Sequence, residues 1–98
     1  MTKQRQRSLE RITGERNIVA KRLKMARHRH DPPWTMQDLS YAVEEDTDLE
    51  ITGSTIGKIE AGIRSAYDWE VAAFARALGI STDWLLGLTL RLRFTKRT

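Results

Sequence analysis

One short segment constrains the fold of this chain more than any other. Residues 54–64 read STIGKIEAGIR, with two isoleucines three positions apart and a glycine behind them. Isoleucines at that spacing share one face of a helix, and a glycine just past them ends it. The segment therefore predicts a short helix that buries Ile56 and Ile59, keeps small polar side chains at its start, and turns sharply at Gly62.

The other apolar residues fall into four further helical patterns with short connections between them. Pro32 and Pro33 stop the first helix, which begins near Glu15 and ends at His28. The expected N-caps are Thr35, Thr52, Asp68 and Ser81, and the expected glycine stops are Gly62, Gly79 and Gly87. The apolar faces give the expected core, which is Leu23, Leu39, Val43, Ile56, Ile59, Val71, Phe74, Leu78, Ile80 and Leu85.

These patterns predict an all-α fold, a compact five-helix bundle over residues 15–87. Residues 1–14 are expected to form a basic N-terminal arm. Residues 88–98 begin with alternating apolar and polar side chains, which predicts a strand over 88–94. The same strand from a second copy would cover its edge and make it a dimerisation element. The alternatives are a strand folded back onto its own domain and an unstructured tail.

Charge is divided unevenly along the chain. Residues 1–30 hold ten Lys or Arg and two Glu, whereas residues 31–60 hold eight acidic residues and one Lys. This division predicts one face for a polyanion such as nucleic acid and another face turned away from it, although solvated basic tails explain the same charges equally well. The most acidic stretch, Glu44–Glu50, breaks the helical pattern and is expected to be a loop.

Metal ions and single-stranded nucleic acid are not expected ligands. The 98 residues contain no cysteine, which excludes disulfides and thiolate metal sites. His28 and His30 are two positions apart, so they do not share a helical face, and no other His or Cys is present to complete a metal site. Trp34, Trp69 and Trp84 are expected to pack helices rather than to form a stacking platform for bases.

Catalysis and membrane insertion are not expected either. The sequence has no glycine-rich phosphate loop, and its nucleophile candidates are hydroxyls at helix starts, so we expect neither an enzyme nor a cofactor. No apolar run approaches the length of a membrane span, and the basic N-terminus lacks the apolar core of a secretory signal. The expected location is the cytoplasm.

Five segments, taken in order, resemble one family. They are RLKMAR at 22–27, TMQDLS at 35–40, ITGSTIGKIEAG at 51–62, FARALGIS at 74–81 and WLLG at 84–87. Together they resemble the Cro/phage-repressor (XRE-type) helix-turn-helix family over about Val19 to Gly87. The resemblance implies a lambda-repressor-like domain that binds double-stranded DNA sequence-specifically. It also implies a transcriptional regulator, which we expect to be a repressor, that works as a homodimer.

The resemblance gives roles to particular residues. The helix that begins near Thr52 would enter the major groove, where Ser54, Thr55 and Lys58 are candidates for base contact. Gln37 and Arg64 are candidates for phosphate contact. The complete candidate set is Lys21, Lys24, Gln37, Thr52, Gly53, Ser54, Thr55, Lys58 and Arg64. For each of them the structural alternative is an ordinary helix start or a solvated side chain.

The resemblance also implies an ion pair between Arg27 and Glu60, which would fix the reading helix against the first helix. The chain departs from the family in three ways. The acidic segment Glu44 to Ile51 is expected to lengthen the turn between the second and third helices, and Met36 stands where the family commonly has glutamine. Gly53 and Gly57 occupy positions that could carry base-contacting side chains, which favours shape or water-mediated readout.

A second class of function fits the same fold. The chain would then be a protein-interaction module, such as an antitoxin that neutralises a partner or an adaptor. Its acidic segment Glu44–Glu50 would contact a basic protein partner, and DNA binding would be secondary. Substitutions in the reading helix and in the acidic segment distinguish the two hypotheses.

Overall fold

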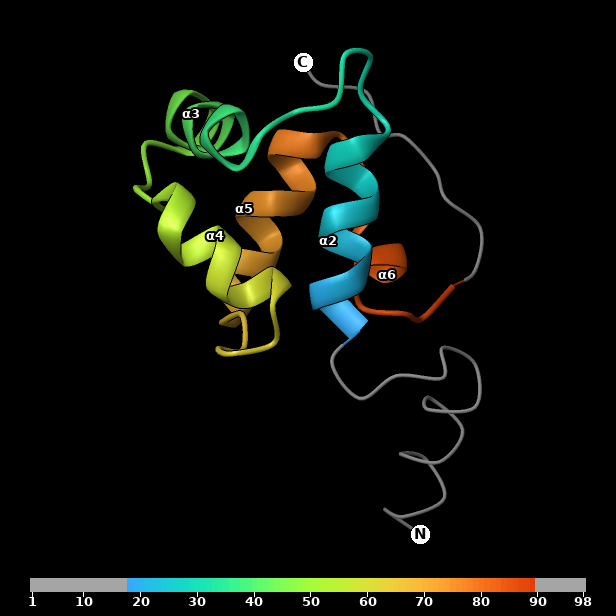
Figure 1. The fold of residues 1–98 in the computed structure, drawn as a ribbon. Coiled ribbons are helices and arrows are strands. Elements are labelled where there is room, and N and C mark those ends of the chain that lie inside the picture. The colour runs from blue at the N-terminus through green and yellow to red at the C-terminus, as the bar shows by residue number, and fades with distance from the viewer. Residues whose placement is uncertain (1–17, 90–98) are drawn as a thin grey trace, which may run out of the picture.

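The fold is all-α in the part of the chain that the computed structural model describes, residues 18–89. These residues form the helices α2 (Ile18–His28), α3 (Met36–Thr47), α4 (Gly53–Glu60), α5 (Asp68–Leu78) and α6 (Thr82–Leu85). In Figure 1, α3 lies beside one end of α5 and above α4, and α2 lies on the other side of α5 from α3. Helix α4 packs against both α2 and α3. Helix α5 packs against α2, α3 and α6, so it is the centre of the bundle.

The core is built from the residues that the helical periodicity selects. All ten expected core residues are buried, and seven of them, including Phe74, have no exposed surface at all. Complete burial of a side chain such as Phe74 stabilises the fold by roughly 1.5–3 kcal/mol relative to its exposure. The core also takes in Ile51 and Trp84, together with five alanines that let the helices approach closely: Ala26, Ala73, Ala75, Ala77 and, at the edge, Ala20.

Three of the four predicted N-caps are confirmed. The side chains of Thr35, Thr52 and Ser81 each accept a hydrogen bond from the backbone N–H three residues later. The prediction for Asp68 is wrong by one position, because Tyr67 is the N-cap and Asp68 is the first residue of α5. The glycine stop at Gly79 is confirmed, since its φ of 67° is a left-handed conformation that favours glycine.

The prediction of a loop over Glu44–Glu50 is wrong for its first half. Helix α3 continues through this segment to Thr47, whose hydroxyl donates to the carbonyl of Val43. Glutamate is a good helix former, so high charge alone does not end a helix. The helix ends at Asp48, which has a φ of 60° and donates its N–H to the carbonyl of Glu44. Only residues 48–52 therefore connect α3 to α4.

The ends of the chain lie outside the described residues. These are the predicted basic arm, residues 1–14, the first residues of the predicted first helix, 15–17, and most of the predicted strand, 90–94. Leu88 and Thr89 are described and are not in a strand. Arg22 in α2 fixes this end of the domain, because its guanidinium donates to the carbonyls of Trp84 and Thr89 and lies over the Trp84 ring. Within residues 18–89, every helix is too short or too polar to cross a membrane.

Candidate nucleic-acid interface

Helix α4 exposes one side along its whole length. Its two isoleucines, Ile56 and Ile59, are completely buried, which turns the opposite side of the helix toward solvent. Ser54, Lys58 and Ala61 are exposed at successive turns on that opposite side. The Ser54 and Lys58 side chains make no hydrogen bond or ion pair with any described residue, so both are open to a partner.

The two threonines at the start of α4 form its N-cap. The Thr52 hydroxyl accepts the backbone N–H of Thr55 at 3.2 Å and lies 3.1 Å from the Thr55 hydroxyl, to which it donates. The donor hydrogen of Thr52 is thus engaged in the cap, while the hydroxyl of Thr55 keeps its own hydrogen for another acceptor. Among the candidate hydroxyls, Ser54 is the one that the helix cap does not use.

The glycines of α4 lie against the start of α3. A Cβ at Gly53 would stand 3.2 Å from the side-chain oxygen of Gln37, and one at Gly57 would stand 3.2 Å from the sulfur of Met36. Both distances are tighter than ordinary contact, so the two glycines allow the start of α3 to approach α4 closely. Gly57 therefore faces Met36 and not the exposed side of α4, and Gly53 sets the position of the exposed Gln37.

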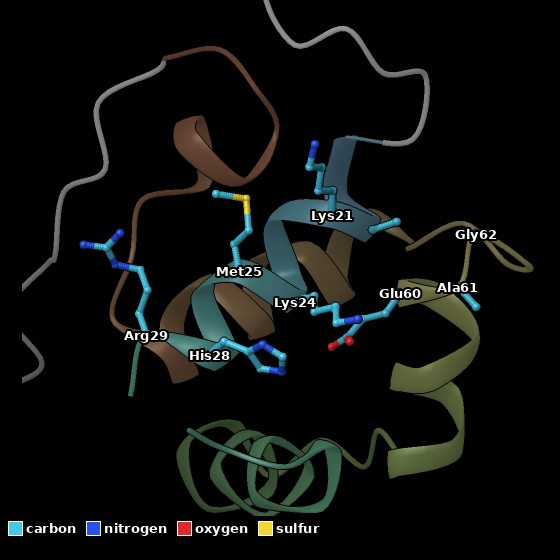
Figure 2. A pocket seen from close by; sticks show the side chains of 9 residues that line it. Lys21, Lys24, Met25, His28, Arg29, Glu60, Ala61 and Gly62 are labelled. Carbon is cyan, nitrogen blue, oxygen red and sulfur yellow. The ribbon is translucent and has the colours of Figure 1, made fainter. Parts of the chain in front are cut away.

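A groove with a basic wall separates α2 from the end of α4. It has a volume of about 730 Å³ and is lined by Ala20, Lys21, Lys24, Met25, His28 and Arg29 from α2 and by Glu60, Ala61 and Gly62 from the end of α4. Lys21, Lys24 and His28 follow one another at spacings of three and four residues, so they form one line along α2, which we call the basic stripe. Figure 2 shows Lys24 and His28 pointing from α2 toward α4.

A buried ion pair joins the two walls of this groove. The Nε and Nη2 groups of Arg27 donate to the two carboxylate oxygens of Glu60 at 2.9 and 2.8 Å, and Nη1 donates to the carbonyl of Trp34. Both side chains are at most 7% exposed. The hydrogen bonds to Glu60 raise the pKa of Arg27 above its usual value. Because Arg27 matches the charge of Glu60, the basic stripe keeps the groove positively charged.

Arg64 forms a second ion pair, which the sequence did not indicate. Its two Nη groups each donate to one carboxylate oxygen of Glu70 at 2.8 Å, and Nη1 also donates to the carbonyl of Ser65. Glu70 is 2% exposed and also accepts the backbone N–H of Tyr67. The hydrogen bonds to Glu70 raise the pKa of Arg64 above its usual value. The predicted phosphate contact of Arg64 therefore has to coexist with this pair.

The histidines and tryptophans are spread over the fold. The rings of His30 and Trp34 are stacked, with centroids 3.7 Å apart and planes 6° from parallel. Burial lowers the pKa of His30. Trp84 is buried in the core, whereas Trp69 is 45% exposed beside the Tyr67 ring. Two of the three tryptophans thus pack against other elements, as expected, and Trp69 lies on the surface.

Four exposed acidic residues lie around the end of α3. Glu44, Glu45, Asp48 and Glu50 are exposed there, and we call them the acidic surface. A helix C-terminus disfavours negative charge, and the last turn of α3 contains no basic residue to offset it. One nearby carboxylate, Asp46, is instead paired with Arg76 of α5 at 2.9 Å.

Sequence reasoning missed two residues of the candidate site. As a functional residue, His28 was considered only as a metal ligand, although its spacing from Lys21 and Lys24 places it on the same face of α2. Glu70 carried no signal, because a glutamate in the first turn of a helix is usually exposed.

Comparison of the chain with models of protein families, with curated proteins and with solved structures finds no match.

Proposed function

We propose that the protein binds double-stranded DNA as a sequence-specific transcriptional regulator. Helices α3 and α4 would act as a helix-turn-helix of the lambda-repressor-like, XRE type. One observation carries this proposal. The exposed side of α4, with Ser54 and Lys58, continues through Ala61 into the groove that the basic stripe lines. The Ser54 and Lys58 side chains are available to bond to the edges of bases, and Lys21 and Lys24 beside them carry the positive charge that binds the flanking phosphates.

Base reading would fall to the exposed side of α4. A helix of this width fits the major groove, where Lys58 would bind the acceptors of a guanine and Ser54 would bond to several base edges. Thr55 would contribute the hydrogen of its hydroxyl. Because Gly57 packs on Met36, only two or three side chains would contact bases, and sequence-dependent DNA shape would supply part of the specificity.

Phosphate binding would come from both sides of the reading helix. On one side, Lys21 and Lys24 of the basic stripe would contact one stretch of the backbone. On the other side, Gln37 is exposed at the start of α3, where the first backbone N–H groups of a helix have no partner within the helix. These contacts would fix the orientation of α4 without reading sequence.

The regulator would act as a homodimer in the cytoplasm, and its activity would be binding rather than catalysis. A two-fold dimer reads two half-sites about one helical turn apart, roughly 34–36 Å, in an inverted repeat. A protein bound across such a site blocks access to it, which favours repression.

Enrichment from pooled random-sequence duplexes tests the proposal. The purified protein is mixed with the pool at moderate salt, and bound duplexes are recovered and sequenced over several rounds. We expect one inverted-repeat motif to emerge, with affinity that falls steeply as salt rises. Salt-sensitive binding without an enriched motif would contradict sequence-specific reading by α4.

A second candidate function rests on the acidic surface. Its four carboxylates lie at a helix end that disfavours them, next to the exposed Tyr41 and Leu49, which are 62% and 40% exposed. Such a surface fits a basic protein partner, as in an antitoxin or an adaptor. Replacing Glu44 and Glu45 by alanine should then abolish partner binding and leave DNA affinity unchanged, whereas the DNA hypothesis predicts that this variant keeps full regulatory activity.

A further inference from the structure

The loop that follows α4 contains Arg64, and a buried carboxylate holds this arginine in position. The Arg64 side chain is 30% exposed, while its partner Glu70 is 2% exposed and belongs to the first turn of α5. The Tyr67 ring lies beneath the guanidinium, with 4.6 Å between Cζ and the ring centroid. Arg64 is thus held at its tip by Glu70 and on one face by Tyr67, and part of its surface stays in contact with solvent.

Two N–H groups of the Arg64 guanidinium have no acceptor among the described residues. A guanidinium has five N–H groups. The two on Nη1 are used by the Ser65 carbonyl and by one oxygen of Glu70, and one on Nη2 is used by the other oxygen of Glu70. The N–H of Nε and the second N–H of Nη2 have no acceptor among residues 18–89. These two bonds point the same way along one edge of the guanidinium, which is the fork that binds carboxylate or phosphate with two hydrogen bonds.

The backbone ties this arginine to the reading helix. The N–H groups of both Ile63 and Arg64 donate to the carbonyl of Lys58, at 2.9 and 3.3 Å. The loop is therefore folded back onto the turn of α4 that carries the Lys58 side chain. The backbone of Arg64 is therefore anchored to the last turn of the helix that would contact bases, and in a DNA complex the anion next to a contacted base is a backbone phosphate.

We propose that Arg64 binds a DNA phosphate through its Nε–H and second Nη2–H, and that Glu70 is the positioning residue that holds this fork in place. The proposal rests on the proposed function, because it takes DNA as the ligand. A buried carboxylate near a DNA-binding surface is electrostatically unfavourable for the approach of phosphates. Its positioning effect on Arg64 outweighs that repulsion.

The variants Arg64→Gln, Glu70→Gln and the double variant R64Q/E70Q test the proposal. Binding to the duplex enriched by the wild-type protein is measured by fluorescence anisotropy at several salt concentrations. R64Q is expected to weaken binding about tenfold and to reduce the slope of log affinity against log salt by about 0.9, the value for one phosphate. E70Q is expected to weaken binding as well, although it removes a negative charge.

The double variant shows whether Glu70 acts through Arg64. If it does, R64Q/E70Q binds no more weakly than R64Q alone, since Glu70 has nothing left to position. R64Q alone leaves the Glu70 carboxylate buried without a counter-charge, which can unfold the protein. The double variant removes both charges and therefore serves as a control for such a folding defect. Circular dichroism at the binding temperature establishes that each variant is folded, and a folded double variant with wild-type affinity and slope overturns the proposal.

Three other results are decisive. Tighter binding by E70Q would show that Glu70 only repels DNA, and it would overturn the positioning role. Failure of the wild-type protein to bind any duplex at low salt would overturn the proposed function and this inference together. Wild-type binding with an unchanged salt slope in R64Q would overturn this inference alone.

Discussion

Glu60, the last residue of α4, accepts two hydrogen bonds from Arg27 of α2, at 2.9 and 2.8 Å, in a site where both side chains are almost completely buried. The pair fixes the end of α4 relative to α2, and with it the angle between the exposed side of α4 and the basic stripe. This ion pair acts together with the buried Ile56 and Ile59 and the contacts of Gly53 and Gly57 with α3 in positioning α4.

Removal of one partner of this pair should destabilise the fold strongly. Arg27→Met leaves the Glu60 carboxylate buried without a counter-charge, and we expect the free energy of unfolding to fall by about 3–5 kcal/mol. Urea unfolding measures this loss. The double variant R27M/E60L removes both charges and is expected to lose less than R27M. A loss of under about 1 kcal/mol for R27M would show that the pair does not fix α4.

Substitution of Gly57 should reveal the packing of α4 on α3. Leucine at this position has to displace Met36, whose sulfur would stand only 3.2 Å from the new Cβ. We expect Gly57→Leu to cost about 1–3 kcal/mol in unfolding free energy despite its better helix propensity. The matched control is Ser54→Leu on the exposed side, which should change stability by less than about 0.5 kcal/mol. Equal effects of the two variants would contradict the contact.

His30 should make the stability depend on pH. Burial lowers its pKa in the folded state, so the unfolded chain takes up a proton at higher pH than the folded protein does. Stability is therefore complete above the unfolded pKa of about 6.5 and is lost as the pH falls below it. The variant His30→Phe keeps a ring to stack on Trp34 but cannot be protonated. We expect the unfolding free energy of the wild type relative to H30F to fall as the pH is lowered from 7.5 to 5.5. Urea unfolding at the two pH values measures this difference, and an equal difference at both would contradict the prediction.

Periodicity was sufficient to predict the core and most of the helices. Residues such as Val71, Phe74 and Leu78 recur at helical spacing and are buried. The apolar face of a short amphipathic helix packs against the core, so this spacing is enough to identify the buried residues. The N-caps at Thr35, Thr52 and Ser81 were predictable for an equally local reason, since the capping hydrogen bond spans only three residues.

The features that the sequence did not indicate depend on an unusual backbone conformation or on contacts between separate elements of the fold. The end of α3 at Asp48 needs a left-handed aspartate, a conformation that sequence patterns associate with glycine or asparagine. The pairing of Arg64 with Glu70 depends on the path of the loop between them, which no periodicity describes. Gly53 and Gly57 were interpreted as missing base contacts because the sequence alone does not show which side of α4 meets Met36.

The most direct test of the central claim is a comparison of two charge reversals that are matched in size and spacing. Ser54→Glu with Lys58→Glu changes the charge on the exposed side of α4. Ala72→Glu with Arg76→Glu makes the same change, four residues apart, on the exposed side of α5. Urea unfolding establishes that both proteins are folded, because R76E also breaks the pair with Asp46.

The affinity of both variants for the enriched duplex is then measured by fluorescence anisotropy at one salt concentration. If α4 reads DNA, S54E/K58E should bind at least about a hundredfold more weakly than the wild type, because it loses two contacts and places two carboxylates against the DNA. A72E/R76E should stay within about tenfold of the wild type, since its charges lie away from the interface. Equal losses in the two variants, or wild-type affinity in S54E/K58E, would contradict the claim.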